Sequence, residues 1–157
     1  MKASKFLALF LFMFVLSGVK VYAHCEIPCG IYDDHMRIHM MEEHVTTIEK
    51  SMNEILNLQK QVPLNYNQIV RWVNNKDAHA DKLREIVTQY FMDQRVKPAT
   101  KEAGKVYDDY VNQLTLLHQI MVHAMLSKQT LDLTHIDELR SLIAAFDKAY
   151  FKNEAKK

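Results

Sequence analysis

Apolar residues recur at spacings of three and four along most of the chain beyond residue 33, a pattern typical of amphipathic helices. The first such stretch begins at Asp33 or Asp34, either of which can cap it, and ends by about Gln61, ahead of Pro63. It predicts one helix with one buried face, formed by Ile38, Met41, Val45, Ile48, Met52 and Ile55.

A second helix is predicted to begin at an N-cap, Asn65, and to end near Arg95, where a connection containing Pro98 leads to residue 100. Its middle, residues 74–77, is so polar that a kink or a break is expected there. Its apolar positions are Ile69, Val70, Val73, Leu83, Ile86, Val87 and Phe91.

Two further helices are predicted in the rest of the chain. One covers about residues 101–127, with an apolar stripe of Val106, Tyr110, Leu114, Leu117, Met121 and Met125. The other begins near Thr134, which with Asp137 resembles a capping box, and carries Ile136, Leu139, Leu142, Ile143, Phe146 and Tyr150. Four helices with short links indicate an all-α fold, an antiparallel up-down four-helix bundle over residues 33–157.

The first 23 residues follow a different pattern, that of a cleavable signal peptide. Lys2 and Lys5 precede an unbroken apolar run over residues 6–15, and residues 21–23 (Val-Tyr-Ala) suit a cleavage point. An uncleaved membrane anchor is the alternative, but the run is short for a span of about 20 residues. We therefore expect an exported protein that resides in a periplasm, an extracellular space or an organelle lumen, without stable membrane association after cleavage following Ala23.

Composition narrows the functional classes. A length of 157 residues suits one domain, and only three glycines and three prolines favour helices over sheet. Loss of the three leader lysines lowers the formal net charge from +1 to −2. Without a basic excess, nucleic-acid binding is not expected.

Both cysteines lie within five residues, in the stretch from His24 to Tyr32. In an oxidising compartment Cys25 and Cys29 could form a disulfide, which would indicate a helical interaction protein. They could also be a pair of thiolate metal ligands, because cleavage after Ala23 places a free amine and an imidazole beside them. A metal-binding protein without catalytic turnover is a further alternative.

Residues 24–32 read His-Cys-x-x-Pro-Cys-Gly-x-Tyr, which resembles the N-terminal hook of nickel-containing superoxide dismutases. The resemblance implies one nickel ion per subunit, superoxide as the substrate, O2 and H2O2 as products, and a homohexamer of four-helix bundles. Soft thiolates with two nitrogen donors suit square-planar Ni(II), which is consistent with that metal.

The same resemblance implies the role of each hook residue. The ligands are the amine and imidazole of His24, the thiolate and backbone amide of Cys25, and the thiolate of Cys29. Tyr32 is expected beside the open coordination position, where it orders water and limits access. Pro28 is expected to follow a cis peptide bond, and Gly30 to permit close backbone approach or a positive φ.

Two positions outside the hook depart from the family's pattern. The family carries a carboxylate that supports the N-terminal imidazole, but His39 stands in its place, and Glu42 and Glu43 follow one turn later. An arginine that supports this carboxylate is replaced by His79. These four residues are the candidates for orienting His24.

The remaining histidines have simpler interpretations. His35 and His39 have the i, i+4 spacing of a zinc-binding pair, but no third ligand follows at a recognisable spacing. Surface or core-edge positions are expected for His44, His118, His123 and His135.

Overall fold

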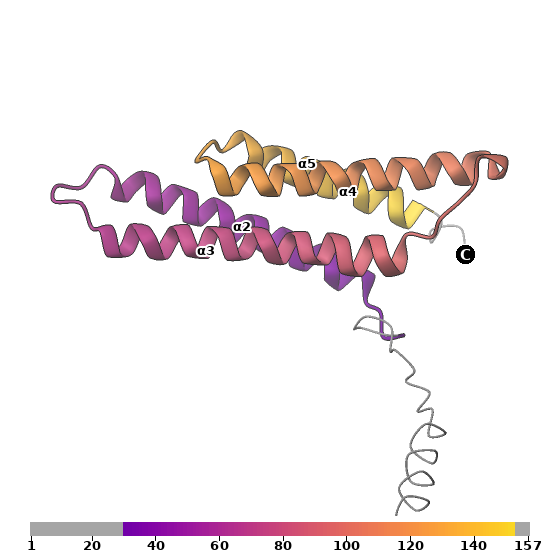
Figure 1. Cartoon of the computed structure of the whole chain (residues 1–157), viewed down its shortest axis with the longest axis horizontal. Coiled ribbons are helices and arrows are strands. Elements are labelled where there is room, and N and C mark those ends of the chain that lie inside the picture. The colour runs from indigo at the N-terminus through magenta and orange to yellow at the C-terminus, as the bar shows by residue number, and fades with distance from the viewer. Residues whose placement is uncertain (1–29, 153–157) are drawn as a thin grey trace, which may run out of the picture. The chain divides into compact units, whose positions relative to one another are not determined.

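A computed structural model describes residues 30–152, and every regular element in that range is helical (Figure 1). The long helices are α2 (Asp34–Leu58), α3 (Tyr66–Glu85), α4 (Lys105–Gln129) and α5 (Thr134–Tyr150). A π-helical segment, η1 (Ile86–Arg95), continues α3, and a single 3-10 turn, η2 (Lys101–Ala103), precedes α4. Each of these helices is too short or too polar to cross a membrane.

The helices pack as an antiparallel up-down bundle. Along the chain, α2 packs on α3, α3 on α4 and α4 on α5, and α5 closes the ring against α2. Figure 1 shows the two hairpins, α2–α3 and α4–α5, lying against each other. The predicted four-helix bundle is therefore confirmed. The leader and hook residues 24–29 lie outside the described residues, so the predicted division at Ala23 stays a prediction.

One continuous apolar core holds the four helices together. The predicted stripe of α2 is buried throughout, from Ile38 to Ile55. Three predicted core positions are wrong, because Val70, Val106 and Met125 are exposed. The core residues contributed by the other helices are Ala80, Leu83, Ile86, Val87, Tyr90, Phe91, Leu117, Ile120, Ala124, Ile136, Leu139, Ile143 and Phe146.

Two of the predicted helix starts are confirmed by their caps. The carboxylate of Asp33 accepts a hydrogen bond from the backbone N–H of Met36 at 2.9 Å, and Asn65 caps α3 in the same way. The capping box at Thr134 is wrong, because Leu133 occupies the N-cap position without a side-chain bond. The third helix begins at Lys105 rather than at residue 101, because the chain turns at Gly104 with φ 54°.

The polar stretch over residues 74–77 neither kinks nor breaks α3, contrary to the sequence-based expectation. Lys76 is 2% exposed, and its ammonium donates to the carbonyls of Ser127 (2.7 Å) and Lys128 (2.5 Å) and to Asp77 (3.0 Å). The two carbonyls belong to the last turn of α4, where a helix lacks internal donors and favours a cation. The polar residues therefore join α3 to α4.

Candidate functional site

Tyr32 is the hook residue whose side-chain surroundings the structure describes. It precedes α2, and the guanidinium carbon of Arg95 lies 4.3 Å from the centre of its ring. The ring of Tyr90 meets it edge-on, with 5.9 Å between centroids. The hydroxyl group donates a long hydrogen bond of 3.5 Å to Gln94 Oε1, and the residue as a whole is 40% exposed. The ring of Tyr32 is thus held by η1, while the residue keeps access to solvent.

Asp34, two residues further, is the centre of a polar cluster beneath Tyr32. Its Oδ1 accepts hydrogen bonds from Arg95 Nε at 2.8 Å and from the Tyr90 hydroxyl at 2.5 Å. Its Oδ2 accepts from Arg95 Nη2 at 2.5 Å and from the Tyr150 hydroxyl at 2.8 Å. The side chain of Asp34 is 9% exposed, so the carboxylate is nearly enclosed by its four donors. Charge-assisted, bidentate pairs of this type are strong and geometrically specific.

The electrostatics of the cluster keep Asp34 ionised. Burial raises the pKa of its carboxyl, but hydrogen bonds from Arg95, Tyr90 and Tyr150 outweigh burial and hold that pKa below its ordinary value. Burial and the neighbouring Asp34 carboxylate raise the pKa of Tyr90 to about 12. The same two causes raise the pKa of Tyr150. Both phenols are therefore donors at neutral pH.

Three chain segments meet at this end of the bundle (Figure 1). They are the start of α2 with Asp34, the end of η1 with Arg95, and the end of α5 with Tyr150. The π-helical hydrogen bonding of η1 continues to its end, where Val96 N–H bonds the carbonyl of Phe91 at 2.8 Å. A π segment shifts the angular position of the residues that follow it, and such segments are frequent at functional sites. Arg95 is the last residue of that segment, so its angular position depends on the π-helical turn.

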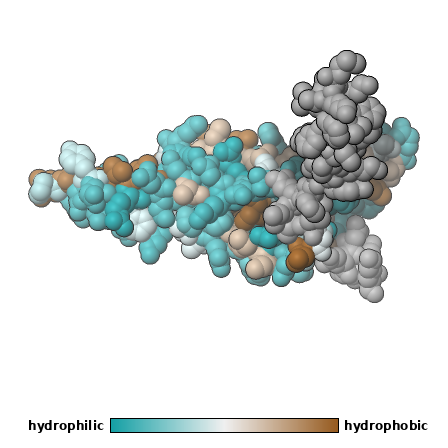
Figure 2. All heavy atoms as spheres, turned by 60° about the horizontal axis from the view of Figure 1, so that its bottom comes forward, coloured by the Kyte–Doolittle hydropathy of each residue, from teal (hydrophilic) through white to brown (hydrophobic). Residues whose placement is uncertain are grey.

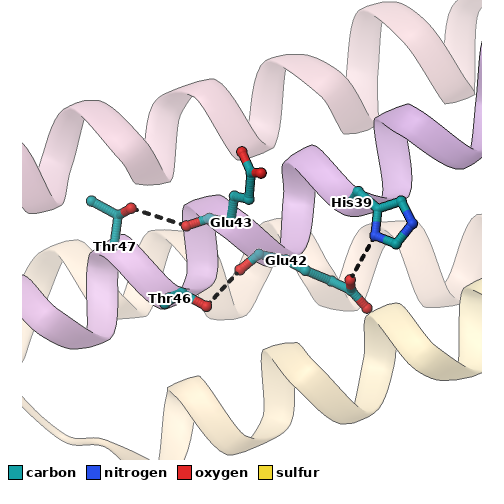
Figure 3. A pocket seen from close by; sticks show the side chains of 5 residues that line it. All are labelled: His39, Glu42, Glu43, Thr46 and Thr47. Carbon is teal, nitrogen blue, oxygen red and sulfur yellow. Dashed lines mark hydrogen bonds and ion pairs between the residues drawn. The ribbon is translucent and has the colours of Figure 1, made fainter.

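The four residues predicted to support the N-terminal imidazole divide between two places. His39 Nδ1 lies 3.4 Å from Glu42 Oε2, beside a shallow hollow on α2 that is also lined by Glu43, Thr46 and Thr47. In Figure 3 the carboxylate of Glu43 points away from that of Glu42. His79 instead contacts His44.

Of the other hook residues singled out above, the structure describes Gly30 and does not describe those at positions 24–29. Gly30 has φ 74°, which confirms the predicted positive φ, and an added Cβ would meet nothing within 4 Å. Backbone conformation is therefore the reason for glycine there. The proposed nickel ligands His24, Cys25 and Cys29, together with Pro28, lie outside the described residues and remain predictions. Their donor set, two thiolates with nitrogen donors, matches the preference of Ni(II).

The sequence-based reasoning missed Asp34, Arg95 and Tyr150 as parts of this site. The sequence pattern indicates Asp34 only as an alternative cap to Asp33, and Tyr150 only as an apolar position of the last helix. The predicted topology could have indicated these contacts. In an up-down bundle, the start of the first helix lies at the same end as the C-terminal ends of the second and fourth helices. Within residues 30–152, no group of three or more His, Cys, Asp or Glu side chains converges to hold a metal ion.

Comparison with known proteins adds one finding. A sequence model of the family described as nickel-containing superoxide dismutase matches residues 19–154. The match covers the hook stretch and nearly the whole bundle. No curated protein and no solved structure gave a significant match.

Proposed function

The chain belongs to the family of nickel-containing superoxide dismutases, and on that premise we propose that residues 24–32 form its nickel-binding active site. The family's members are oxidoreductases that contain nickel and act on superoxide. The observation that carries the assignment is the match over residues 19–154, a range that includes both cysteines. One nickel ion per subunit is proposed.

The proposed ligands are the amine and imidazole of His24, the thiolate and backbone amide of Cys25, and the thiolate of Cys29. The chemistry that nickel supplies there is Ni(II)/Ni(III) cycling, through which one superoxide is oxidised to O2 and a second takes up an electron and two protons to give H2O2. Thiolates are soft, electron-rich donors, so these residues suit both the metal and its higher oxidation state. Metal uptake requires the two thiols and the amine to lose their protons.

Tyr32 is proposed to stand beside the open coordination position. The ring is held against Arg95 and Tyr90, so its orientation does not depend on the long bond to Gln94. A phenol held in this way orders water and limits which molecules approach, without being a ligand itself. The Asp34 cluster positions Tyr32, because the same Arg95 that contacts the ring is bound by Asp34.

Export is proposed to create one of the ligands. Cleavage after Ala23 would convert the nitrogen of His24 from an amide into a basic amine, and only the amine is a good donor. His39, Glu42, Glu43 and His79 remain the candidates for orienting the imidazole of His24. The protein would act in a periplasm, an extracellular space or an organelle lumen, with no stable membrane association and no nucleic-acid partner.

A homohexamer is proposed as the assembly, as in the family that the hook resembles. Exposed apolar side chains at the α2–α3 connection are consistent with a subunit contact, above all Val62, which is 97% exposed, and Tyr66, which is 70% exposed. Figure 2 shows a mainly hydrophilic face with hydrophobic residues at that tip. Sedimentation of the purified protein measures the assembly directly.

The site is tested with two single substitutions, Cys25→Ser and Cys29→Ser. Each removes one thiolate, so nickel content and superoxide turnover should both fall to background. The matched control is His118→Gln, which changes an exposed histidine on α4. Turnover that persists in either cysteine variant contradicts the proposed ligand set. If the two cysteines form a disulfide instead, the wild-type chain lacks nickel and its mass is two protons lower.

A further inference from the structure

Two histidines that are not among the proposed hook ligands face each other between neighbouring helices. His44 on α2 and His79 on α3 are both partly buried, and their Nδ1 atoms are 3.1 Å apart. The two rings are nearly perpendicular, at 76°, with centroids 5.0 Å apart. The backbone of each residue is fixed within a long helix. The pair is therefore preorganised across the α2–α3 contact.

The distance between the two nitrogens suits a shared metal ion. With bonds of about 2.1 Å to imidazole, two nitrogen ligands stand about 3.0 Å apart at a right angle and about 3.4 Å apart at a tetrahedral angle. The observed 3.1 Å lies within this range. Without metal, one ring donates its Nδ1 proton to the other. With metal, each ring stays neutral and carries its proton on Nε2, so both Nδ1 lone pairs are available.

Burial and nearby charge keep the pair neutral. Burial is the main cause that lowers the pKa of both imidazoles. His79 and Lys82 lower the pKa of His44 further, and Lys82 lowers the pKa of His79 further. Glu43 opposes this by attracting positive charge toward His44. Neutral imidazole is the form that binds metal. Lys82 is exposed, so its repulsion of a bound cation is screened.

We propose that His44 and His79 form a second metal site, which binds one divalent late first-row ion (nickel, copper or zinc) through both Nδ1 atoms, with water in the other positions. Imidazole is a suitable ligand for all three ions. This site shares no ligand with the proposed hook. The chain would then bind one metal ion on the bundle in addition to the nickel ion of the hook.

A second close pair provides an internal comparison. His123 on α4 and His135 on α5 have Nδ1 atoms 3.3 Å apart. The charge of His135 acts on Asp132, an exposed residue between α4 and α5 whose carboxylate accepts the backbone N–H of Thr134 at 3.0 Å. At the first pair, by contrast, the charge of Glu43 acts on His44 itself and favours its positive form. The two pairs thus differ in electrostatic support rather than in spacing.

The test uses the full chain with His24→Gln, Cys25→Ser and Cys29→Ser, which removes the imidazole and both thiolates of the hook. Calorimetric titration with Ni(II) and Zn(II) in a non-chelating buffer should show one ion per chain. Adding His44→Gln or His79→Gln should abolish this binding, and adding His118→Gln should not. The combined change His123→Gln and His135→Gln should leave it intact. Lys82→Gln should strengthen it, because a repelling charge is removed.

Spectroscopy supplies an independent readout that does not depend on the stability of the variants. In the cysteine-free chain, one equivalent of Zn(II) should shift the ring signals of two histidines together in NMR spectra. Electron paramagnetic resonance with Cu(II) should show coupling to two imidazole nitrogens. Binding that survives His44→Gln and His79→Gln, binding that disappears with the His123–His135 pair, or no binding at all would overturn the proposal. The activity of the hook enters none of these measurements.

Discussion

Arg95 and Asp34 join the end of η1 to the first residue of α2 through two parallel hydrogen bonds. Nε of Arg95 donates to Oδ1 of Asp34 at 2.8 Å, and Nη2 donates to Oδ2 at 2.5 Å. The same guanidinium lies 4.3 Å below the centre of the Tyr32 ring. One ion pair therefore fixes the corner of the bundle from which the hook leaves and also holds the hook's tyrosine.

Replacing Asp34 with alanine should destabilise the bundle substantially. The hydroxyl groups of Tyr90 and Tyr150 and the guanidinium of Arg95 would lose their common acceptor. Because Arg95 is about a quarter exposed and can recover water, we expect a loss of about 2–3 kcal/mol in the free energy of unfolding rather than the full value for a buried pair. Urea denaturation followed by circular dichroism measures it. Asp34→Asn keeps one acceptor oxygen and should cost less, so equal losses would contradict this account of the cluster.

The stability of the folded chain should fall in acid partly through Asp34. Its pKa is lower in the folded state than the ordinary value of 3.8, so the unfolded state binds the proton more readily. The stabilisation from Asp34 is complete above the ordinary value and is lost as the pH falls through the lower, folded-state pKa. Urea midpoints should be measured from neutral pH down to a pH below 3.8. Over this interval they should drop more steeply for wild type than for Asp34→Asn. Identical slopes would show that Asp34 is not stabilised in its ionised form.

Lys76 should be essential for joining α3 to α4. Lys76→Ala removes an ammonium that binds two terminal carbonyls of α4 and leaves those carbonyls buried without a donor. We expect a loss of about 2–4 kcal/mol in the free energy of unfolding, since hydrogen bonds from a charged donor are among the stronger ones. Lys82→Ala, at an exposed position on the same helix, is the control and should change stability by about 0.5 kcal/mol or less. A similar effect at both positions would mean that the buried bonds contribute nothing.

Two substitutions should distinguish the role of the Tyr32 ring from the role of its hydroxyl group. Tyr32→Phe retains the ring over Arg95 and removes only a long hydrogen bond, so stability and nickel content should stay unchanged while turnover or its sensitivity to small anions changes. Tyr32→Ala also removes the ring, with an expected cost of about 0.5–1 kcal/mol for the lost cation–π contact. Denaturation, metal analysis and a superoxide assay on the two variants check this. Nickel loss in Tyr32→Phe would indicate that the phenol is a ligand.

The amine of His24 should be indispensable if it is a ligand. A variant with one additional alanine between Ala23 and His24, processed so that this alanine becomes the N-terminus, carries an amide at His24 instead. Nickel content and turnover should both be lost, while the helical circular dichroism of the bundle stays the same. Retained nickel with full turnover in that variant would refute coordination by the His24 amine.

The helices were predictable because each one follows from a local pattern. The spacing from Ile38 to Ile55 defines one buried face, and Asp33 and Asn65 lie next to the amides that they cap. The hook motif is recognisable for the same reason, since its residues are contiguous, and its ligand set stays a prediction. Both features depend on neighbours in sequence, which periodicity and spacing can identify.

The missed contacts join residues far apart in sequence. Asp34 meets Arg95 and Tyr150 only when α2, η1 and α5 end at the same corner. The sequence predicts a kink or a break over residues 74–77 and gives no partner for Lys76, because the carbonyls that it binds belong to another helix. For His44 the sequence predicts a surface or core-edge position and for His79 a supporting role beside His24, and only the packing of α2 on α3 brings their rings together. Long-range partners of this kind depend on the relative register of helices, which a sequence pattern does not specify.

The most direct test of the proposed nickel hook combines three readings on one sample of the purified, processed protein. Intact mass gives the N-terminal residue, elemental analysis gives the metal, and a superoxide assay gives turnover. The account predicts a chain that begins at His24, about one nickel ion per chain, and turnover that is lost when nickel is removed. Full turnover in a metal-free sample, or a chain that begins elsewhere and still turns over superoxide with nickel bound, would contradict it.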